Sequence, residues 1–301
     1  MALTAFKRIL FILGLMIMAS YAQATTFFGV DLDLLNVGVE VRVNDIPIYD
    51  DKKSGQLTVE LPSPDSIVNG VNSLTILARL PKIGKKYAEN YEPGAYVSAK
   101  LFRQENEGNK EYLAKILLKL NSDGLLLPVK TELESVAEEK FEQLENKFAE
   151  LTVYASIDSP FPEWVWQSGQ NIEASSENFD ELYQAYEDIH RALSSDDQSL
   201  LRELYSQRAK EIAIAYYLSD ESAGHEKIST GKDVRNDDLD LLNLVSQNKL
   251  ELQIFASGKL ARIASPANVQ PIAFIQKGTR IFHLHKFLFY KNEKNQWVMI
   301  R

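Results

Sequence analysis

Two histidines near the end of the chain are the first residues whose spacing could support chemistry. His283 and His285 are separated by one residue, so an extended strand would place both imidazoles on one face, with their Cα atoms roughly 7 Å apart. Such a pair could share a metal ion or supply a general base. A metal would need a third ligand, which the sequence does not place nearby, and Ile281, Phe287 and Phe289 share the same face. We therefore favour core or cavity-lining histidines, keep catalysis as a weak alternative, and expect no metal or cofactor.

Aromatic side chains provide two further candidate sites. Trp164 and Trp166 would face the same way in an extended segment, where they could stack on a sugar, contact a protein partner or seal an interface between domains. Tyr186 and Tyr216 fall within predicted helices, where their hydroxyl groups could donate hydrogen bonds into a pocket. We favour packing for both groups and keep ligand or partner binding as the alternative.

The familiar catalytic and nucleotide-binding signatures are absent from the sequence. There is no Gly-x-Ser-x-Gly motif, and the chain has no cysteine for thiol catalysis or thiolate metal ligation. Segment 224–232 has six residues between its glycines instead of four, so it does not match a phosphate-binding loop. Asp31, Asp33 and Asn36 lack the glycine and the terminal glutamate of a calcium loop. These absences favour a protein that is not an enzyme.

The beginning of the chain predicts export. Lys7 and Arg8 precede an uncharged run, and Ala22-Gln23-Ala24 supplies the small residues of a cleavage site, so we predict a signal peptide over 1–24 that is cleaved after Ala24. The run is shorter than the roughly 20 apolar residues of a spanning helix, and we expect no membrane anchor after cleavage. A short signal without disulfides indicates the periplasm.

Charge and composition narrow the possible partners. The 301 residues include 33 Lys and Arg against 42 Asp and Glu, a net charge of −9, with 45% hydrophobic residues. This composition is typical of a globular protein, and the acidic balance argues against nucleic acid as a partner. The expected partner is another protein or a small ligand.

The first half of the chain has the period of two that is typical of strands with one buried face. Valines at 37, 39, 41 and 43 alternate with Gly38, Glu40 and Arg42 before the turn Asn44-Asp45. This pattern predicts an antiparallel β-sandwich domain over 25–170, and Val71-Asn72-Ser73-Leu74 resembles the strand entry of a generic secreted sandwich module. Further strands are predicted over 56–61, 73–80, 95–102 and 112–120.

Two segments bear on the end of this domain. Apolar residues spaced by three and four between Thr131 and Leu151 predict an amphipathic helix near 131–147, although a strand over 148–157 is an open alternative. Ser159-Pro160-Phe161-Pro162 fits neither a helix nor a central strand, because proline lacks an N–H group. We place the domain boundary near residue 170.

The second half predicts an α+β domain over 171–301, with three helices packed on a bent antiparallel sheet. Helices are expected from a cap at Ser175 or Ser176, from a cap at Asp196 or Asp197, and over 237–245, with a loop over 219–236. Predicted strands cover 250–256, 259–264, 271–275, 280–290 and 297–300.

The order of elements in this half resembles the nuclear-transport-factor-two-like, or ketosteroid-isomerase-like, cone fold. The resemblance lies in the helix pair over 177–218, the strand over 258–262 and the closing hairpin over 287–300, which contains Trp297. It implies a pocket between sheet and helices, which in some family members holds a small apolar ligand or an acid/base pair. One departure is that no early hairpin separates the helices in this sequence.

Together these patterns predict an exported, non-enzymatic periplasmic protein that binds a protein partner or a small ligand. A specific version is an inhibitor or immunity protein whose acidic surface covers a basic cleft on a toxin. The alternative from a different class is a cone-fold enzyme that uses a pocket histidine, tyrosine or carboxylate for proton transfer or hydrolysis. A third hypothesis is carbohydrate binding through the two tryptophans.

Overall fold

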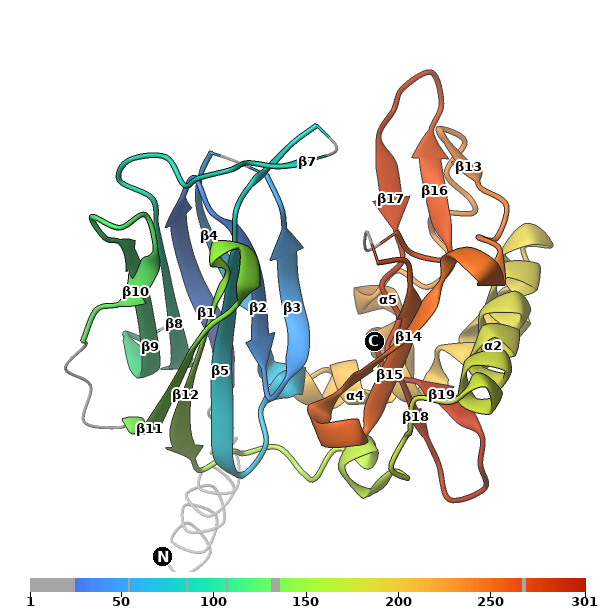
Figure 1. The fold of residues 1–301 in the computed structure, drawn as a ribbon. Helices are drawn as coiled ribbons and strands as arrows, with labels where there is room; N and C mark the ends of the chain where they lie inside the picture. The colour runs from blue at the N-terminus through green and yellow to red at the C-terminus, as the bar shows by residue number, and fades with distance from the viewer. Residues whose placement is uncertain (1–24, 54, 85, 107, 131–135, 267–268) are drawn as a thin grey trace, which may run out of the picture.

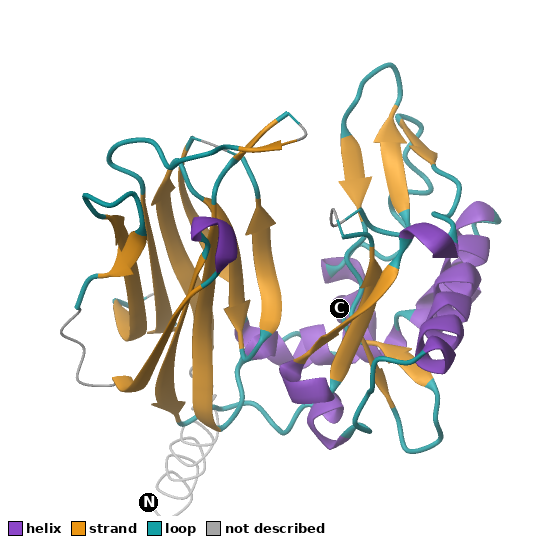
Figure 2. Ribbon diagram, viewed as in Figure 1, coloured by secondary structure: helices purple, strands orange, loops and turns teal. Residues whose placement is uncertain are grey.

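The computed structural model describes residues 25–53, 55–84, 86–106, 108–130, 136–266 and 269–301. The chain is a mixture of helices and antiparallel sheets, as the sequence predicted (Figure 2). The N-terminal unit, residues 25–157, contains strands together with two short 3-10 helices, and the C-terminal unit, residues 176–301, contains all four α-helices of the described chain (Figure 1). The predicted signal peptide over 1–24 lies outside the described residues.

The first sheet of the N-terminal unit has the strand order β10-β9-β8-β1-β4. The strands predicted over 56–61, 95–102 and 112–120 are confirmed here, each with slightly different ends. The bounds are β1 Thr26–Leu35, β4 Gln56–Pro62, β8 Tyr96–Glu105, β9 Lys110–Leu120 and β10 Leu126–Pro128.

The second sheet has the order β11-β12-β5-β2-β3. Asn44 and Asp45 both have positive φ, the backbone conformation of a two-residue type I′ hairpin, and they join β2 to β3. A small additional ribbon pairs β6 Lys82–Ile83 with β7 Lys86–Tyr87. The bounds of the second sheet are β2 Gly38–Val43, β3 Ile46–Asp51, β5 Gly70–Arg79, β11 Val136–Gln143 and β12 Ala149–Ile157.

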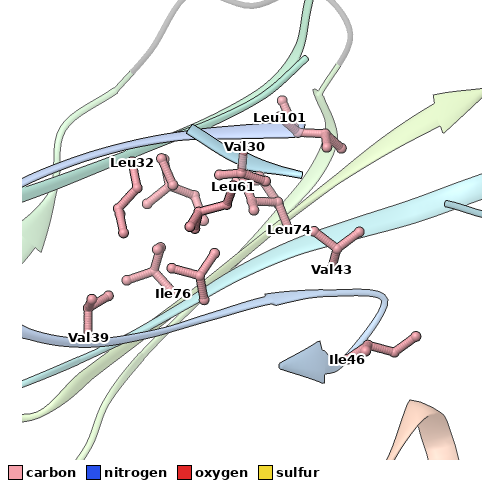
Figure 3. Packing of buried hydrophobic residues seen from close by; sticks show 14 of the residues in the cluster. Val30, Leu32, Val39, Val43, Ile46, Leu61, Leu74, Ile76 and Leu101 are labelled. Atoms are coloured by element: carbon pink, nitrogen blue, oxygen red, sulfur yellow. The ribbon is translucent and has the colours of Figure 1, made fainter. Parts of the chain in front are cut away.

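One hydrophobic core lies between these two sheets. The alternating valines of β2 are fully buried, and side chains from both sheets meet in this core (Figure 3). Alternation places one face of each strand in the core, which explains why the period of two is so clear in the sequence. The side chains labelled in Figure 3 are Val30, Leu32, Leu61 and Leu101 from the first sheet and Val39, Val43, Ile46, Leu74 and Ile76 from the second.

The helix predicted near 131–147 is wrong over the part of it that the structure describes, since residues 131–135 lie outside the described chain. Residues Val136–Gln143 form the edge strand β11, and the alternative strand over 148–157 is confirmed as β12. Phe141 pairs with Leu151 and is half-buried, whereas Glu142 is exposed. Pairing with β12 outweighs the helical spacing, and charged residues are common on edge strands.

The helices of the C-terminal unit follow the predicted caps in part. The Ser175 and Asp197 side chains accept hydrogen bonds from the backbone N–H groups of Asn178 and Leu200, as expected of N-caps. The second predicted helix is divided at Tyr205, and a further helix capped by Asp220 lies in the segment expected to be a loop. The bounds are α2 Ser176–Ser194, α3 Gln198–Leu204, α4 Ser206–Ala215 and α5 Glu221–Lys227.

The strands of this unit form two small antiparallel sheets, with orders β13-β16-β17 and β14-β15-β18-β19. The short helix predicted over 237–245 is wrong, because Leu239–Leu241 pairs as β13 with β16. The strand expected over 280–290 is divided between the two sheets as β17 and β18. The bounds are β13 Leu239–Leu241, β14 Glu251–Phe255, β15 Leu260–Ala264, β16 Ala273–Gln276, β17 Phe282–Leu284, β18 Phe289–Lys291 and β19 Trp297–Met299.

Direct contacts join the two units. The N–H of Thr26 donates to the Tyr217 hydroxyl oxygen at 3.1 Å, and Arg301 forms an ion pair with Asp65. Phe255, Leu260, Leu288 and Ile300 of the C-terminal unit belong to the same buried cluster as the N-terminal core. A second buried cluster is formed by the C-terminal unit together with Ile172 of the segment that precedes it. None of the helices in the described residues has the length and apolar character needed to cross a membrane.

Candidate functional site

A cluster of buried charged residues lies between the two units. The outer face of the second sheet, which carries Glu40, Arg42 and Thr75, faces β14 and β15 of the C-terminal unit. Glu40 and Thr75 are only 5% and 7% exposed, although the alternation of Glu40 with buried valines suggested a face open to water. The polar side of the sheet is therefore the wall of a cleft between the units.

A network of ion pairs organises the N-terminal wall of this cleft. The Arg79 guanidinium bridges two carboxylates, with Nη2 2.7 Å from Glu40 and Nη1 3.1 Å from Asp50. Arg42 Nε lies 2.5 Å from the other Glu40 oxygen. Burial works to raise the pKa of Glu40, but Arg42 and Arg79 outweigh it and hold that pKa below its ordinary value. Glu40 is therefore ionised and fixes both arginines in place.

An aromatic ring connects the two walls. The Phe255 ring at the end of β14 contacts two guanidinium groups, with Arg42 Cζ 5.8 Å and Arg262 Cζ 4.9 Å from its centroid. Arg42 comes from the N-terminal unit and Arg262 from the C-terminal unit. Cation–π attraction of this kind is worth about 0.5–2 kcal/mol per contact, and the contact between Arg42 and Phe255 links the two units across the cleft.

Arg262 differs from the other arginines of the cleft in its partners. It is 6% exposed, and its Nε donates to the Gln253 side-chain oxygen at 2.8 Å. Among the ion pairs of the described residues, none joins Arg262 to a carboxylate, whereas Arg42 and Arg79 each have two. Burial lowers the pKa of the Arg262 guanidinium, with Glu40 and Asp50 opposing the shift from a greater distance. A buried cation without a direct counter-charge has an unsatisfied demand for an anion.

Lys52 extends the positive character of this region. Burial lowers the pKa of its ammonium group, Asp50 opposes this shift, and the nearby Arg79 and Lys82 lower the pKa further. Arg42, Lys52, Arg79 and Arg262 line a cavity of about 310 Å³ together with two carboxylates, so four positive charges minus two negative charges leave +2. The remaining wall includes Ile254, Phe255 and Pro266.

A second cavity of about 430 Å³ lies on the other side of Arg42. Its walls include Lys140, Glu150 and Tyr154 from the second sheet, together with Trp166. The Thr75 and Thr152 hydroxyl groups lie 2.8 Å apart in this wall. The two cavities share Arg42 in their walls, and we refer to them together as the interdomain cleft.

The predicted histidines lie outside this cleft and are not equivalent. His283 is exposed on β17, while His285 is half-buried and its Nε2 lies 3.0 Å from the Asp233 carboxylate. The His285 ring contacts Phe274 and Phe287, with centroids 5.3 and 5.5 Å apart. The hydrogen bond from His285 lowers the pKa of Asp233. The pair has the geometry of a base and its orienting carboxylate, but neither residue lines either cavity of the cleft.

The structure also limits the metal hypothesis for these histidines. Within the described residues, no three histidine, cysteine or acidic side chains are grouped closely enough to hold a metal ion. His190 Nε2 donates to the Leu242 carbonyl at 2.9 Å, and His225 Nδ1 lies 3.0 Å from the Thr230 hydroxyl oxygen. Neither therefore completes a site with His283 and His285.

Both predicted tryptophans are buried, and their segment is not extended. Trp164 caps a 3-10 helix, Val165–Ser168, is 1% exposed, and donates its Nε1–H to the Ile67 carbonyl at 2.7 Å. Trp166 is 5% exposed, contributes to the wall of the larger cavity, and its Nε1 has no hydrogen-bond partner in the described chain. Trp164 therefore presents no free ring face to a sugar.

The predicted tyrosines occupy different environments. Tyr186 is fully buried on α2, where its ring contacts Phe287 and Phe289, and burial raises its pKa. Its hydroxyl oxygen accepts a hydrogen bond from the Ile263 N–H at 3.4 Å. Tyr216 is half-buried under the Lys227 ammonium group, 4.8 Å from its ring centroid. The structure does not bring these tyrosines to the interdomain cleft.

Sequence reasoning missed the residues that line the cleft. Glu40 and Arg42 were interpreted only as the polar side of a strand, because period two cannot distinguish solvent from a second unit. A usable signal was present in Leu260-Ala261-Arg262-Ile263-Ala264, since an arginine inside an apolar strand is rarely buried without a purpose. Comparison of the chain with protein-family models, curated proteins and solved structures gives no match.

Proposed function

We propose that this protein is a non-catalytic, exported binding protein that holds a small organic anion in the interdomain cleft. The observation that carries the proposal is Arg262, which is 6% exposed, lines the 310 Å³ cavity and has no carboxylate partner at ion-pair distance in the described chain. A bound carboxylate or phosphate group would supply the missing counter-charge through the paired N–H donors of the guanidinium.

The surrounding residues support an anion of limited size and charge. The cavity lies near the lower end of the 300–1,000 Å³ typical of ligand sites, and its net charge of +2 suits a dianion. Glu40 and Asp50 fix Arg79 in place and repel larger polyanions. Phe255 and Ile254 provide an apolar wall, so an organic dicarboxylate fits better than an inorganic ion.

The wider architecture is part of the same proposal. We propose that residues 25–170 are a β-sandwich module and that 171–301 form a cone-like α+β module, joined so that the ligand lies between them. The predicted signal over 1–24 supports a periplasmic location, where solutes reach the protein directly. The lack of an imidazole or hydroxyl nucleophile among the described residues that line the smaller cavity favours binding over catalysis.

Isothermal titration calorimetry at low salt tests this proposal. The probes are inorganic phosphate, succinate and phthalate. Comparing their affinities separates the contribution of charge from the contribution of an aromatic ring. We expect phthalate to bind more tightly than succinate, and Arg262→Gln to weaken binding at least about tenfold, or 1.4 kcal/mol. Arg191→Gln is the matched control, because Arg191 is an exposed arginine on α2 that lines neither cavity of the cleft. Equal binding by wild type and Arg262→Gln would remove the proposal.

A further inference from the structure

The β17 arm, residues 277–286, projects from the C-terminal unit without cover. In Figure 1 it is part of the hairpin formed by β16 and β17 at the top of that unit. Every residue of the arm is exposed except His285, which is half-buried. Ile281, Phe282 and Leu284 are 55%, 53% and 42% exposed. Three large apolar side chains within four residues therefore meet water.

The exposed side chains lie on both faces of the arm. Successive residues of a strand point to opposite sides, so Phe282 and Leu284 share one face while Ile281 and His283 share the other. A strand of an ordinary sheet buries at least one face, as β2 does. Exposure on both faces of an apolar strand indicates a surface that a partner covers.

The backbone of the arm also presents an open edge. β17 is the last strand in the order β13-β16-β17, and β16 is its only partner strand among the residues that the structure describes. The N–H of Gln276 donates to the Ile281 carbonyl and the N–H of His285 to the Ile272 carbonyl, which marks these as hydrogen-bonded pairs. The alternation of an antiparallel ladder then turns the N–H and C=O groups of Phe282 and Leu284 toward the open edge.

The charge of the arm is opposite to that of the chain. Lys277, Arg280 and Lys286 are exposed, and no Asp or Glu occurs between residues 276 and 292, although the chain as a whole has a net charge of −9. Lys277 is partly neutralised by Asp240 at 3.5 Å. Arg280 and Lys286 form no ion pair with another described residue, so they remain available to an acidic partner.

We propose that the β17 arm binds an extended segment of a partner protein with alternating apolar and acidic side chains, which adds as a strand to the edge of β17. Main-chain hydrogen bonds at Phe282 and Leu284 align the partner segment along the edge of β17. Arg280 and Lys286 form ion pairs with its acidic side chains. A second copy of the chain fits less well, because pairing β17 with itself would bring these cations together. A lipid surface would not form hydrogen bonds with the N–H and C=O groups of Phe282 and Leu284 in the way that a strand does. An acidic protein is also repelled from anionic lipid.

Fluorescence anisotropy with two capped ten-residue peptides tests this inference. One alternates valine and glutamate, and the other alternates valine and lysine. The acidic peptide is expected to bind at least about tenfold more tightly, and hydrogen exchange at the Phe282 and Leu284 amides is expected to slow when it is bound. The double variant Phe282→Ser with Leu284→Ser, and separately Arg280→Glu, should each weaken binding at least about tenfold. Val71→Ser, at an exposed valine of the N-terminal unit, is the control.

The opposing outcomes are equally specific. Equal affinity for both peptides, or unchanged exchange at the two amides, would overturn the proposal. Self-association in sedimentation that the double variant abolishes would assign the arm to a second copy instead. Co-sedimentation with phosphatidylglycerol vesicles that the double variant abolishes would assign it to lipid. The arm lies outside the interdomain cleft, so failure of this proposal leaves anion binding intact, and the reverse also holds.

Discussion

Glu211 on α4 allows a quantitative prediction about stability and pH. The side chain is 2% exposed, and burial raises its pKa to about 7. Neither carboxylate oxygen has a well-formed hydrogen bond in the described chain, and the nearby Gln207 side chain and Val165 N–H offset the effect of burial only in part. The protonated carboxyl group is therefore the form that the fold prefers.

The sign and size of the effect follow from that pKa. Between pH 4.5 and 7 the folded chain keeps a proton on Glu211 that the unfolded chain has released, so the free energy of unfolding falls as pH rises through this window. Because each pKa unit is worth about 1.4 kcal/mol, the full cost of ionised Glu211 is about 3 kcal/mol above pH 7. At pH 5 the cost is only about 1 kcal/mol.

The substitution Glu211→Gln removes this charge with little change in shape. Denaturant unfolding at pH 5 and pH 8 gives the free energy of unfolding of each protein at both pH values. Between pH 5 and pH 8 this free energy should fall by about 2 kcal/mol more in wild type than in Glu211→Gln. Glu203→Gln is the control, because Glu203 is exposed on α3. The difference between Glu211→Gln and wild type would be the same at both pH values if burial did not raise the Glu211 pKa, and that result would refute the reasoning.

Three further substitutions test other parts of the structure. Gly224→Ala should lower the free energy of unfolding by about 1–3 kcal/mol, because a Cβ at this position would lie 2.0 Å from the Ala209 carbonyl oxygen. An unchanged midpoint in denaturant unfolding would contradict the close approach of α4 and α5. Trp164→Phe should cost about 1–3 kcal/mol by leaving the Ile67 carbonyl unpaired, and thermal unfolding that matches wild type would argue against that hydrogen bond. Arg262→Met should leave the free energy of unfolding unchanged or raise it by up to about 2 kcal/mol, because it removes a buried cation; a large loss of stability would make Arg262 a structural residue.

The N-terminal unit shows what hydrophobic periodicity could predict. The valines of β2 identify one face of a strand, and burial of that face is enough to specify the register. The helix predicted near 131–147 failed for a related reason, because Phe141 and Leu144 satisfy helical spacing while Phe141 also satisfies the pairing with β12. Local spacing cannot reveal that a neighbouring strand has an unpaired edge.

The interdomain cleft could not be predicted from either half of the sequence alone. Arg42 and Arg262 are 220 positions apart, and only docking of the two units brings both against Phe255. The predicted His283 and His285 were chosen for their spacing, but the strand that holds them stands at the edge of a small sheet, where His283 is exposed. The sequence shows which residues are ionisable or aromatic, but the residues that they contact are set by long-range contacts in the fold.

The central claim is that a small anion binds between the two units at Arg262. Anomalous diffraction from crystals soaked in selenate tests it most directly, because selenium marks the position of the anion itself. We predict the strongest selenium peak within about 4 Å of the Arg262 guanidinium, and no peak there in crystals of Arg262→Gln. Selenium peaks at other surfaces with an empty cavity beside Arg262 and Arg79 would contradict the account.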